Sequence, residues 1–192
     1  MRIRCAGRLA GIVAISMLAL SGTAKAQDVI KLKVSHFLPP SSNAQTKLIE
    51  PWAKQVEQES HGRIKVEIYP SMQLGGKPPQ LFDQVRTGVA DVVWTLPGYT
   101  PGRFPKTEVF ELPFVTGATA EATTKAIWDI YNKYLKDEYK DVKVLLLHCH
   151  APGLVHMKDK PVKTMEDLQG QKIRLPVKPI GDALKLLGAT PV

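Results

Sequence analysis

Two short stretches near the start of the sequence, residues 30–37 and 63–69, alternate apolar with polar residues. A period of two is typical of β-strands that bury one face. Between these stretches, apolar residues recur every three or four positions over residues 44–59, which predicts an amphipathic α-helix. A strand, a helix and a second strand in this order indicate a parallel pair of strands.

The same two periods continue along the rest of the chain. A helix is predicted over residues 78–87 and a mostly apolar strand over residues 90–95, followed by loops with a short extended piece between Pro105 and Pro113. The later predictions are helices over 120–135 and 180–187, a helical turn over 165–168, and strands over 142–150, 154–157 and 172–175. Alternating strands and helices predict an α/β fold.

Ligands of α/β folds bind at the carboxyl ends of the strands. In the predicted arrangement these ends carry five residues that could line such a site: His36, Phe37, Trp94, Leu96 and His150. Histidine and aromatic side chains at strand ends are also common in packed cores, so a core histidine and a packed aromatic remain alternative interpretations of the first two.

The first 26 residues have the form of a secretory signal peptide. Three arginines within the first eight residues precede an apolar run over residues 9–20, and the small-residue pattern Ala24-Lys25-Ala26 follows. The apolar run is shorter than the roughly 20 residues that a membrane-spanning helix needs. We therefore predict cleavage after Ala26 and export to the periplasm.

Removal of this segment halves the net charge and leaves a single cysteine. Residues 27–192 keep 22 basic and 18 acidic residues, a net charge of +4 rather than the +8 of the whole sequence. Because the excess is moderate and no basic run occurs, no nucleic-acid partner is expected. Cys149 is the only cysteine in this range, so no internal disulfide can form.

One arginine stands out as a ligand-binding candidate. In the segment DLQGQKIRLP, residues 167–176, Gly170 frees the backbone before the predicted strand, and Arg174 lies near the strand's end. Its planar guanidinium offers a fork of donors that matches the two oxygens of a carboxylate. The plain alternative is an arginine that faces water, as most strand arginines do.

Other chemistries find less support in the sequence. His148 and His150 are two residues apart on a predicted strand and could imitate a metal site with His156, but no carboxylate has a suitable spacing nearby. The glycines at 75 and 76 lack the spacing of a phosphate-binding loop, and no nucleophile elbow occurs. We therefore expect no enzyme activity, no metal and no cofactor. A metal-dependent extracytoplasmic hydrolase is the alternative that a metal and esterase assay would test.

Five ordered motifs carry a resemblance to a known family: PPSSN after the first strand, GRIKVEIYPSMQLGG at 62–76, GVADVVW at 88–94, FELPFV at 110–115, and DLQGQKIRLP. In this order and spacing the sequence resembles the DctP-type solute-binding receptors of TRAP transporters. The resemblance implies a two-lobed periplasmic-binding-protein-like fold of type II. It further implies an extracytoplasmic receptor that closes around an organic acid and delivers it to TRAP transporter membrane subunits, driven by an ion gradient.

The resemblance also assigns roles to individual residues. The family's carboxylate-binding arginine falls on Arg174, and the loop after the first strand places His36 and Phe37 near the ligand. Trp94 and Leu96 fall where the family places side chains against the ligand's body. A second arginine that sialic-acid receptors of this family use aligns with Leu154, which argues against sialic acid. A small keto, hydroxy or aromatic acid remains, or a dicarboxylate whose second carboxylate is held by His36, His150 or backbone amides.

The domain division follows from the same resemblance. We expect lobe I over residues 27–151 and the start of lobe II over residues 152–192. Because family members continue well beyond the GATPV at residues 188–192, we expect an incomplete second lobe with exposed strand edges and apolar patches. Two alternatives to a transport receptor follow, namely a ligand-sensing receptor for a signalling partner and a truncated fragment without function.

Overall fold

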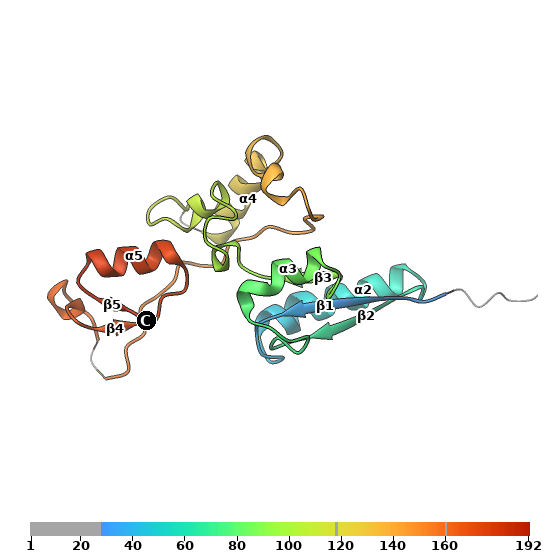
Figure 1. Cartoon of the computed structure of the whole chain (residues 1–192), viewed down its shortest axis with the longest axis horizontal. Helices are drawn as coiled ribbons and strands as arrows, with labels where there is room; N and C mark the ends of the chain where they lie inside the picture. Colours follow the sequence, from blue (N-terminus) through green and yellow to red (C-terminus); the bar gives the residue numbers. More distant parts are fainter. Residues whose placement is uncertain (1–27, 118, 160) are drawn as a thin grey trace, which may run out of the picture.

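The computed structural model describes residues 28–117, 119–159 and 161–192, and the predicted signal peptide lies outside this range. Figure 1 shows a group around the sheet of β1, β2 and β3, a helical group around α4, and a C-terminal group of β4, β5 and α5 that is set apart from the sheet. Within the described residues, no helix is long and apolar enough to cross a membrane.

The first sheet has β1 (Ile30–His36) at its centre. It is flanked by β2 (Ile64–Tyr69) and β3 (Val92–Trp94), and both pairings are parallel. Val34 aligns with residue 68 on one side and residue 92 on the other, and it is buried at this crossing. The three strands predicted from the sequence and the parallel pairing of the first two are confirmed, and β3 runs parallel to β1 as well. Their carboxyl ends therefore meet at one edge of the sheet.

The predicted amphipathic helix is present but starts with wider turns. A π-helical segment, η1 (Gln45–Ile49), runs directly into α2 (Glu50–Glu59), and Ile49 and Ala53 are buried. The carboxylate of Glu57 accepts a 3.0 Å hydrogen bond from the amide of Val66 in β2. This contact fastens the last turns of α2 to the sheet.

A second core lies among the helices that follow the sheet. It joins α3 (Leu81–Arg86), which follows the short helix η2 (Pro78–Gln80), to α4 (Ala120–Ile130) and its continuations η5 (Tyr131–Leu135) and η6 (Lys136–Tyr139). Its buried side chains are Phe82, Phe104, Ile127, Leu135 and Tyr139. Phe104 sits between two aromatic rings, edge-on to Phe82 at 4.9 Å and stacked on Tyr139 at 4.8 Å.

The C-terminal group is a small parallel unit. It contains the turn η7 (Glu166–Leu168), strands β4 (Lys172–Ile173) and β5 (Thr190–Pro191), and α5 (Lys178–Leu186) between them. Gly188 ends the helical run with a φ of +89°, a backbone conformation that glycine adopts without strain. The predicted turn, strand and helix are all present here.

Three predicted extended segments are wrong as secondary structure. Residues 142–150 and 154–157 run without strand assignment, because no described strand lies beside them to complete a ladder. The piece between the two prolines is instead the 3-10 helix η4 (Thr107–Glu111). Its start is capped by Glu138, whose carboxylate accepts from the amides of Lys106 (2.6 Å) and Thr107 (3.0 Å). Leu145 is 58% exposed and Leu154 is 78% exposed, so neither segment is buried as a strand would be.

Candidate functional site

A row of aromatic rings lies at the carboxyl ends of the two neighbouring strands β1 and β3. Phe37 follows β1 directly, and Trp94 is the last residue of β3. Their rings stack with centroids 5.5 Å apart and planes 20° apart. Tyr99, in the 3-10 helix η3 (Pro97–Tyr99), contacts Phe37 edge-on, with the two ring centroids 5.2 Å apart. We call Tyr99, Phe37, Trp94 and His148 the aromatic row, and the contact of His148 with Trp94 is described next.

The fourth ring of the row comes from a segment far away in the sequence. The indole Nε1–H of Trp94 donates a 3.0 Å hydrogen bond to Nε2 of His148, and the two ring centroids are 5.9 Å apart. Leu96, half-buried, lies between Trp94 and η3 in the chain and precedes the helix as its cap residue. Two of the predicted site residues, Phe37 and Trp94, are thus in contact.

His36 does not belong to the ligand surface as predicted. Its side chain is fully buried, and both ring nitrogens are used inside the protein. Nε2 lies 2.9 Å from Oε1 of Gln45, while Nδ1 accepts a 3.2 Å hydrogen bond from the amide of Leu38. Burial lowers the pKa of this imidazole, although the hydrogen bond to Gln45 opposes the effect. The alternative of a core histidine is therefore the correct interpretation, and His36 holds the turn after β1 against η1.

Two other predicted residues lie apart from the row. Arg174 is exposed and follows β4, in the group that Figure 1 shows apart from β3. His150 is exposed, and its Nδ1 lies 2.6 Å from the carbonyl oxygen of Ala151. No contact among the described residues joins either side chain to the aromatic row. His148, two residues earlier, occupies the position that we predicted for His150.

A carboxylate lies behind the row, against the backbone of η3. Glu111 packs on Gly98, where an added Cβ would come 2.2 Å from its Oε2, so only glycine leaves room for it. Within the described part of the chain this buried oxygen has no hydrogen-bond partner. Burial raises the pKa of Glu111, with a smaller contribution from Glu108, while the amide of Gly98 lowers it. The packing of this carboxylate therefore helps to position Tyr99.

This environment makes stability depend on pH through Glu111. Above the ordinary carboxyl pKa of 4.5 the unfolded chain has released the proton that the folded chain still holds, so stability falls as pH rises toward the raised value. We expect Glu111→Gln to remove this slope and to unfold at a higher urea concentration than the unchanged chain at pH 7. Urea denaturation at pH 4, 5, 6 and 7 measures both. An equally steep loss of stability in the variant would contradict this explanation.

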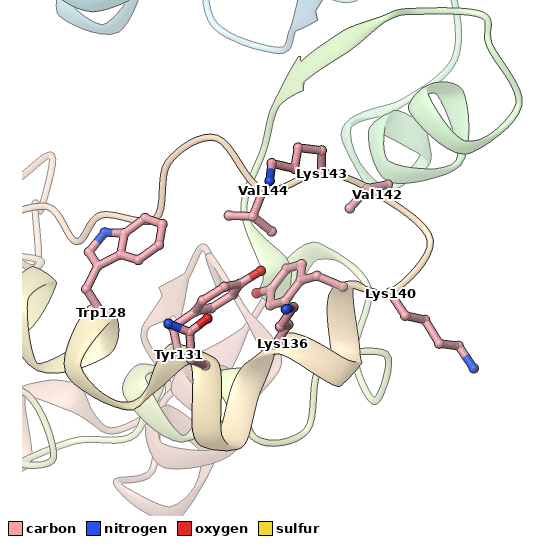
Figure 2. A pocket seen from close by; sticks show the side chains of 9 residues that line it. Trp128, Tyr131, Lys136, Lys140, Val142, Lys143 and Val144 are labelled. Atoms are coloured by element: carbon pink, nitrogen blue, oxygen red, sulfur yellow. The ribbon is translucent and has the colours of Figure 1, made fainter.

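A cavity of about 310 Å³ lies elsewhere, between the end of α4 and residues 142–144. Figure 2 shows Tyr131 and Trp128 on its helical side, while the ammonium of Lys140 points away from it. Its lining residues include none of the six predicted ligand-binding residues. Across the described residues, no group of three or more His, Cys, Asp and Glu side chains could hold a metal ion. Neither feature adds to the aromatic row as a candidate site.

The family follows from comparison with known proteins. Residues 34–192 match the family described as bacterial extracellular solute-binding protein, family 7, also named DctP. The chain belongs to this family. As a family 7 protein it has the predicted α/β fold of two-lobed TRAP periplasmic binding proteins. The motif resemblance found in the sequence is thereby confirmed.

Several family 7 relatives have known ligands. A TRAP solute-binding protein of an unidentified marine microbe, specific for aromatic acids and solved with 3-hydroxybenzoate, is 53% identical, with a TM-score of 0.81 over 86% of this chain and 51% of that chain. One from Rhodoferax ferrireducens T118, solved with copurified benzoate, is 49% identical, with a TM-score of 0.81 over 85% and 51%. The ectoine/5-hydroxyectoine-binding periplasmic protein UehA of Ruegeria pomeroyi is 27% identical over 94% of this chain and 53% of its own length. The chain spans about half the length of the relatives it matches.

Sequence reasoning missed Tyr99 and His148 as members of the row. The sequence did contain a signal for His148, because its neighbours Leu147 and Cys149 are apolar and an extended segment that buries them turns residue 148 outward. The pattern could not distinguish His148 from His150, because both face the same way in an extended segment. Only the position of Trp94 in space decides between them.

Proposed function

We propose that this protein is an extracytoplasmic receptor of a TRAP transporter and that its ligand is an aromatic carboxylate. The observation that carries the proposal is the aromatic row at the carboxyl ends of β1 and β3, where α/β folds bind ligands. An aromatic ring packed on such a row gains about 0.5 to 1.5 kcal/mol beyond its buried area. The two relatives with 3-hydroxybenzoate and benzoate support this ligand class.

The ligand's charge requires a second element. In the proposed mechanism Arg174 of lobe II, residues 152–192, closes onto the carboxylate while lobe I, residues 27–151, holds the ring. Arg174 is exposed and forms no ion pair among the described residues, so its guanidinium is available as a fork of donors. Leu96 would contribute apolar wall beside Trp94. Delivery to TRAP membrane subunits in the periplasm, without enzyme activity, completes the proposed role.

The ring requirement is tested by a matched pair of acids. Benzoate and cyclohexanecarboxylate share the carboxylate and the ring size, but only benzoate has a π-face. We expect benzoate to raise the melting temperature of the full chain, because a ligand at 100 times its Kd adds about 2.7 kcal/mol of stability. The saturated acid should bind roughly tenfold more weakly by calorimetry, about the effect of one aromatic contact.

Two outcomes would contradict the proposal. Equal affinities for the two acids would show that the aromatic row does not select the ligand. No shift with any carboxylate, including aliphatic and dicarboxylic acids, would show that this chain is not an acid receptor.

A further inference from the structure

The aromatic row contains one polar group whose chemistry the structure defines at the level of single atoms. The indole nitrogen of Trp94 can only donate a hydrogen bond. Because it lies 3.0 Å from Nε2 of His148, this imidazole nitrogen must be the acceptor and carries no proton. In the neutral ring the proton is then on Nδ1. Trp94 thus sets the tautomer of His148 and leaves it with a single outward donor.

The two rings also share an orientation. Their planes differ by 23°, and the indole N–H and the imidazole lone pair both lie in the planes of their rings. The two rings are stacked with their centroids 5.9 Å apart, a large offset, and the hydrogen bond joins the edges that face each other. His148 therefore continues the surface of Trp94, and its Nδ1–H, the ring position that does not contact the indole, belongs to an exposed side chain.

The position of His148 is fixed from both sides by α4. The carbonyl of Leu147 accepts a 2.9 Å hydrogen bond from the indole of Trp128, and the amide of Cys149 donates a 3.0 Å hydrogen bond to Oγ1 of Thr124. The side chains of Leu147 and Cys149 pack against the second core, so the residue between them turns outward. Residues 142–150 form no strand ladder, but these two hydrogen bonds hold the backbone on either side of His148 in place.

From these contacts we infer that His148 is a specificity-determining residue that donates a hydrogen bond from Nδ1 to an acceptor oxygen on the ring of the ligand. The inference rests on the proposed function and goes beyond it, because it selects oxygen-substituted aromatic acids over unsubstituted ones. Trp94 has two roles in this arrangement. It packs against the ring, and it positions His148 by fixing its tautomer. Since Nε2 is occupied, His148 offers the ligand a donor and no acceptor.

Two substitutions separate these roles. In His148→Gln, the amide oxygen takes the place of Nε2 and can still accept from Trp94, but the donor at Nδ1 is lost. In His148→Asn, the amide NH₂ takes the place of Nδ1–H and keeps a donor near that position, while the partner of Trp94 is lost. His150→Gln is the matched control, since His150 is exposed two residues further on and does not contact the row.

The experiment measures the affinities of the full chain and these variants for 3-hydroxybenzoate and benzoate by calorimetry. The unchanged chain and His150→Gln are expected to prefer 3-hydroxybenzoate by about tenfold, a typical value for one hydrogen bond. His148→Gln is expected to bring the ratio close to one, because it weakens the binding of 3-hydroxybenzoate about tenfold more than the binding of benzoate. His148→Asn is expected to retain part of the preference.

A second measurement requires no ligand. Nitrogen-15 NMR of the histidine side chains is expected to show the Nδ1–H tautomer for His148 and its loss in Trp94→Phe, which has no indole N–H. A preference that survives in His148→Gln, or an Nε2–H tautomer, would overturn the inference and leave the proposed receptor function standing. Failure of both acids to bind the unchanged chain would overturn the inference and the proposed function together.

Discussion

Arg174→Ala is expected to lose about 2 to 5 kcal/mol of binding free energy for an aromatic carboxylate, which is roughly 30-fold to several thousand-fold in Kd. The reason is that closure of the two lobes removes the carboxylate from water and leaves it unpaired in the variant. Arg174→Lys should recover part of the loss, since an ammonium keeps the charge but not the fork of two parallel hydrogen bonds. Calorimetric titration with benzoate measures all three proteins.

Lys172→Ala is the matched control for this prediction. Lys172 is exposed, carries the same charge, and lies two residues earlier in β4. A general loss of positive charge would weaken binding in both variants, whereas a specific contact affects Arg174 alone. If Arg174→Ala and Lys172→Ala lowered the affinity equally, the assignment of the carboxylate to Arg174 would be wrong.

Phe104→Ala is expected to lower the free energy of unfolding by about 3 to 5 kcal/mol. Phe104 is 2% exposed and is held between Phe82 and Tyr139, so its removal leaves a cavity at the centre of the second core. Small domains have about 5 to 15 kcal/mol of stability in total, so the loss is a large fraction of it. Urea denaturation, followed by the fluorescence of the tryptophans, measures the change in midpoint.

Phe114→Ala provides a comparison with the same chemistry and the opposite environment. Phe114 is 104% exposed, so truncation of its side chain removes no packing, and the expected change stays within about 0.5 kcal/mol. Similar losses in both variants would mean that the packing around Phe104 does not stabilise the fold. A loss confined to Phe104→Ala would confirm that the second core supports the helices that hold His148.

The sequence predicted those elements whose partners are near in the chain. β1, β2 and the helix over η1 and α2 have clear hydrophobic periods and contact one another in chain order, while β3 is short and mostly apolar and pairs with β1 on its other side. The segment 142–150 has an equally apolar pattern but no described strand beside it, so it does not form a ladder. A periodic pattern shows that a segment can form a strand, but the backbone hydrogen bonds need a second strand.

The candidate site was predictable in part for a related reason. Strand ends identified Phe37 and Trp94, because topology alone brings the ends of parallel strands together. The same argument wrongly included His36, because the side chain of this last residue of β1 is buried and its Nε2 contacts Gln45. His148 comes from a segment 54 residues away from Trp94, and no local pattern encodes such a contact.

The central place of β1 in its sheet has a consequence for how the protein is made. The strand is synthesised before both of its neighbours, and β3 ends only at Trp94, about 60 residues later. At roughly 5 to 20 residues per second, a ribosome needs on the order of 3 to 12 s to supply the missing partner. During this time the three-stranded sheet cannot be completed, so this part of the nascent chain cannot reach its folded structure. A secretion machinery that accepts only unfolded chains would find its substrate in that state, without a chaperone having to unfold it.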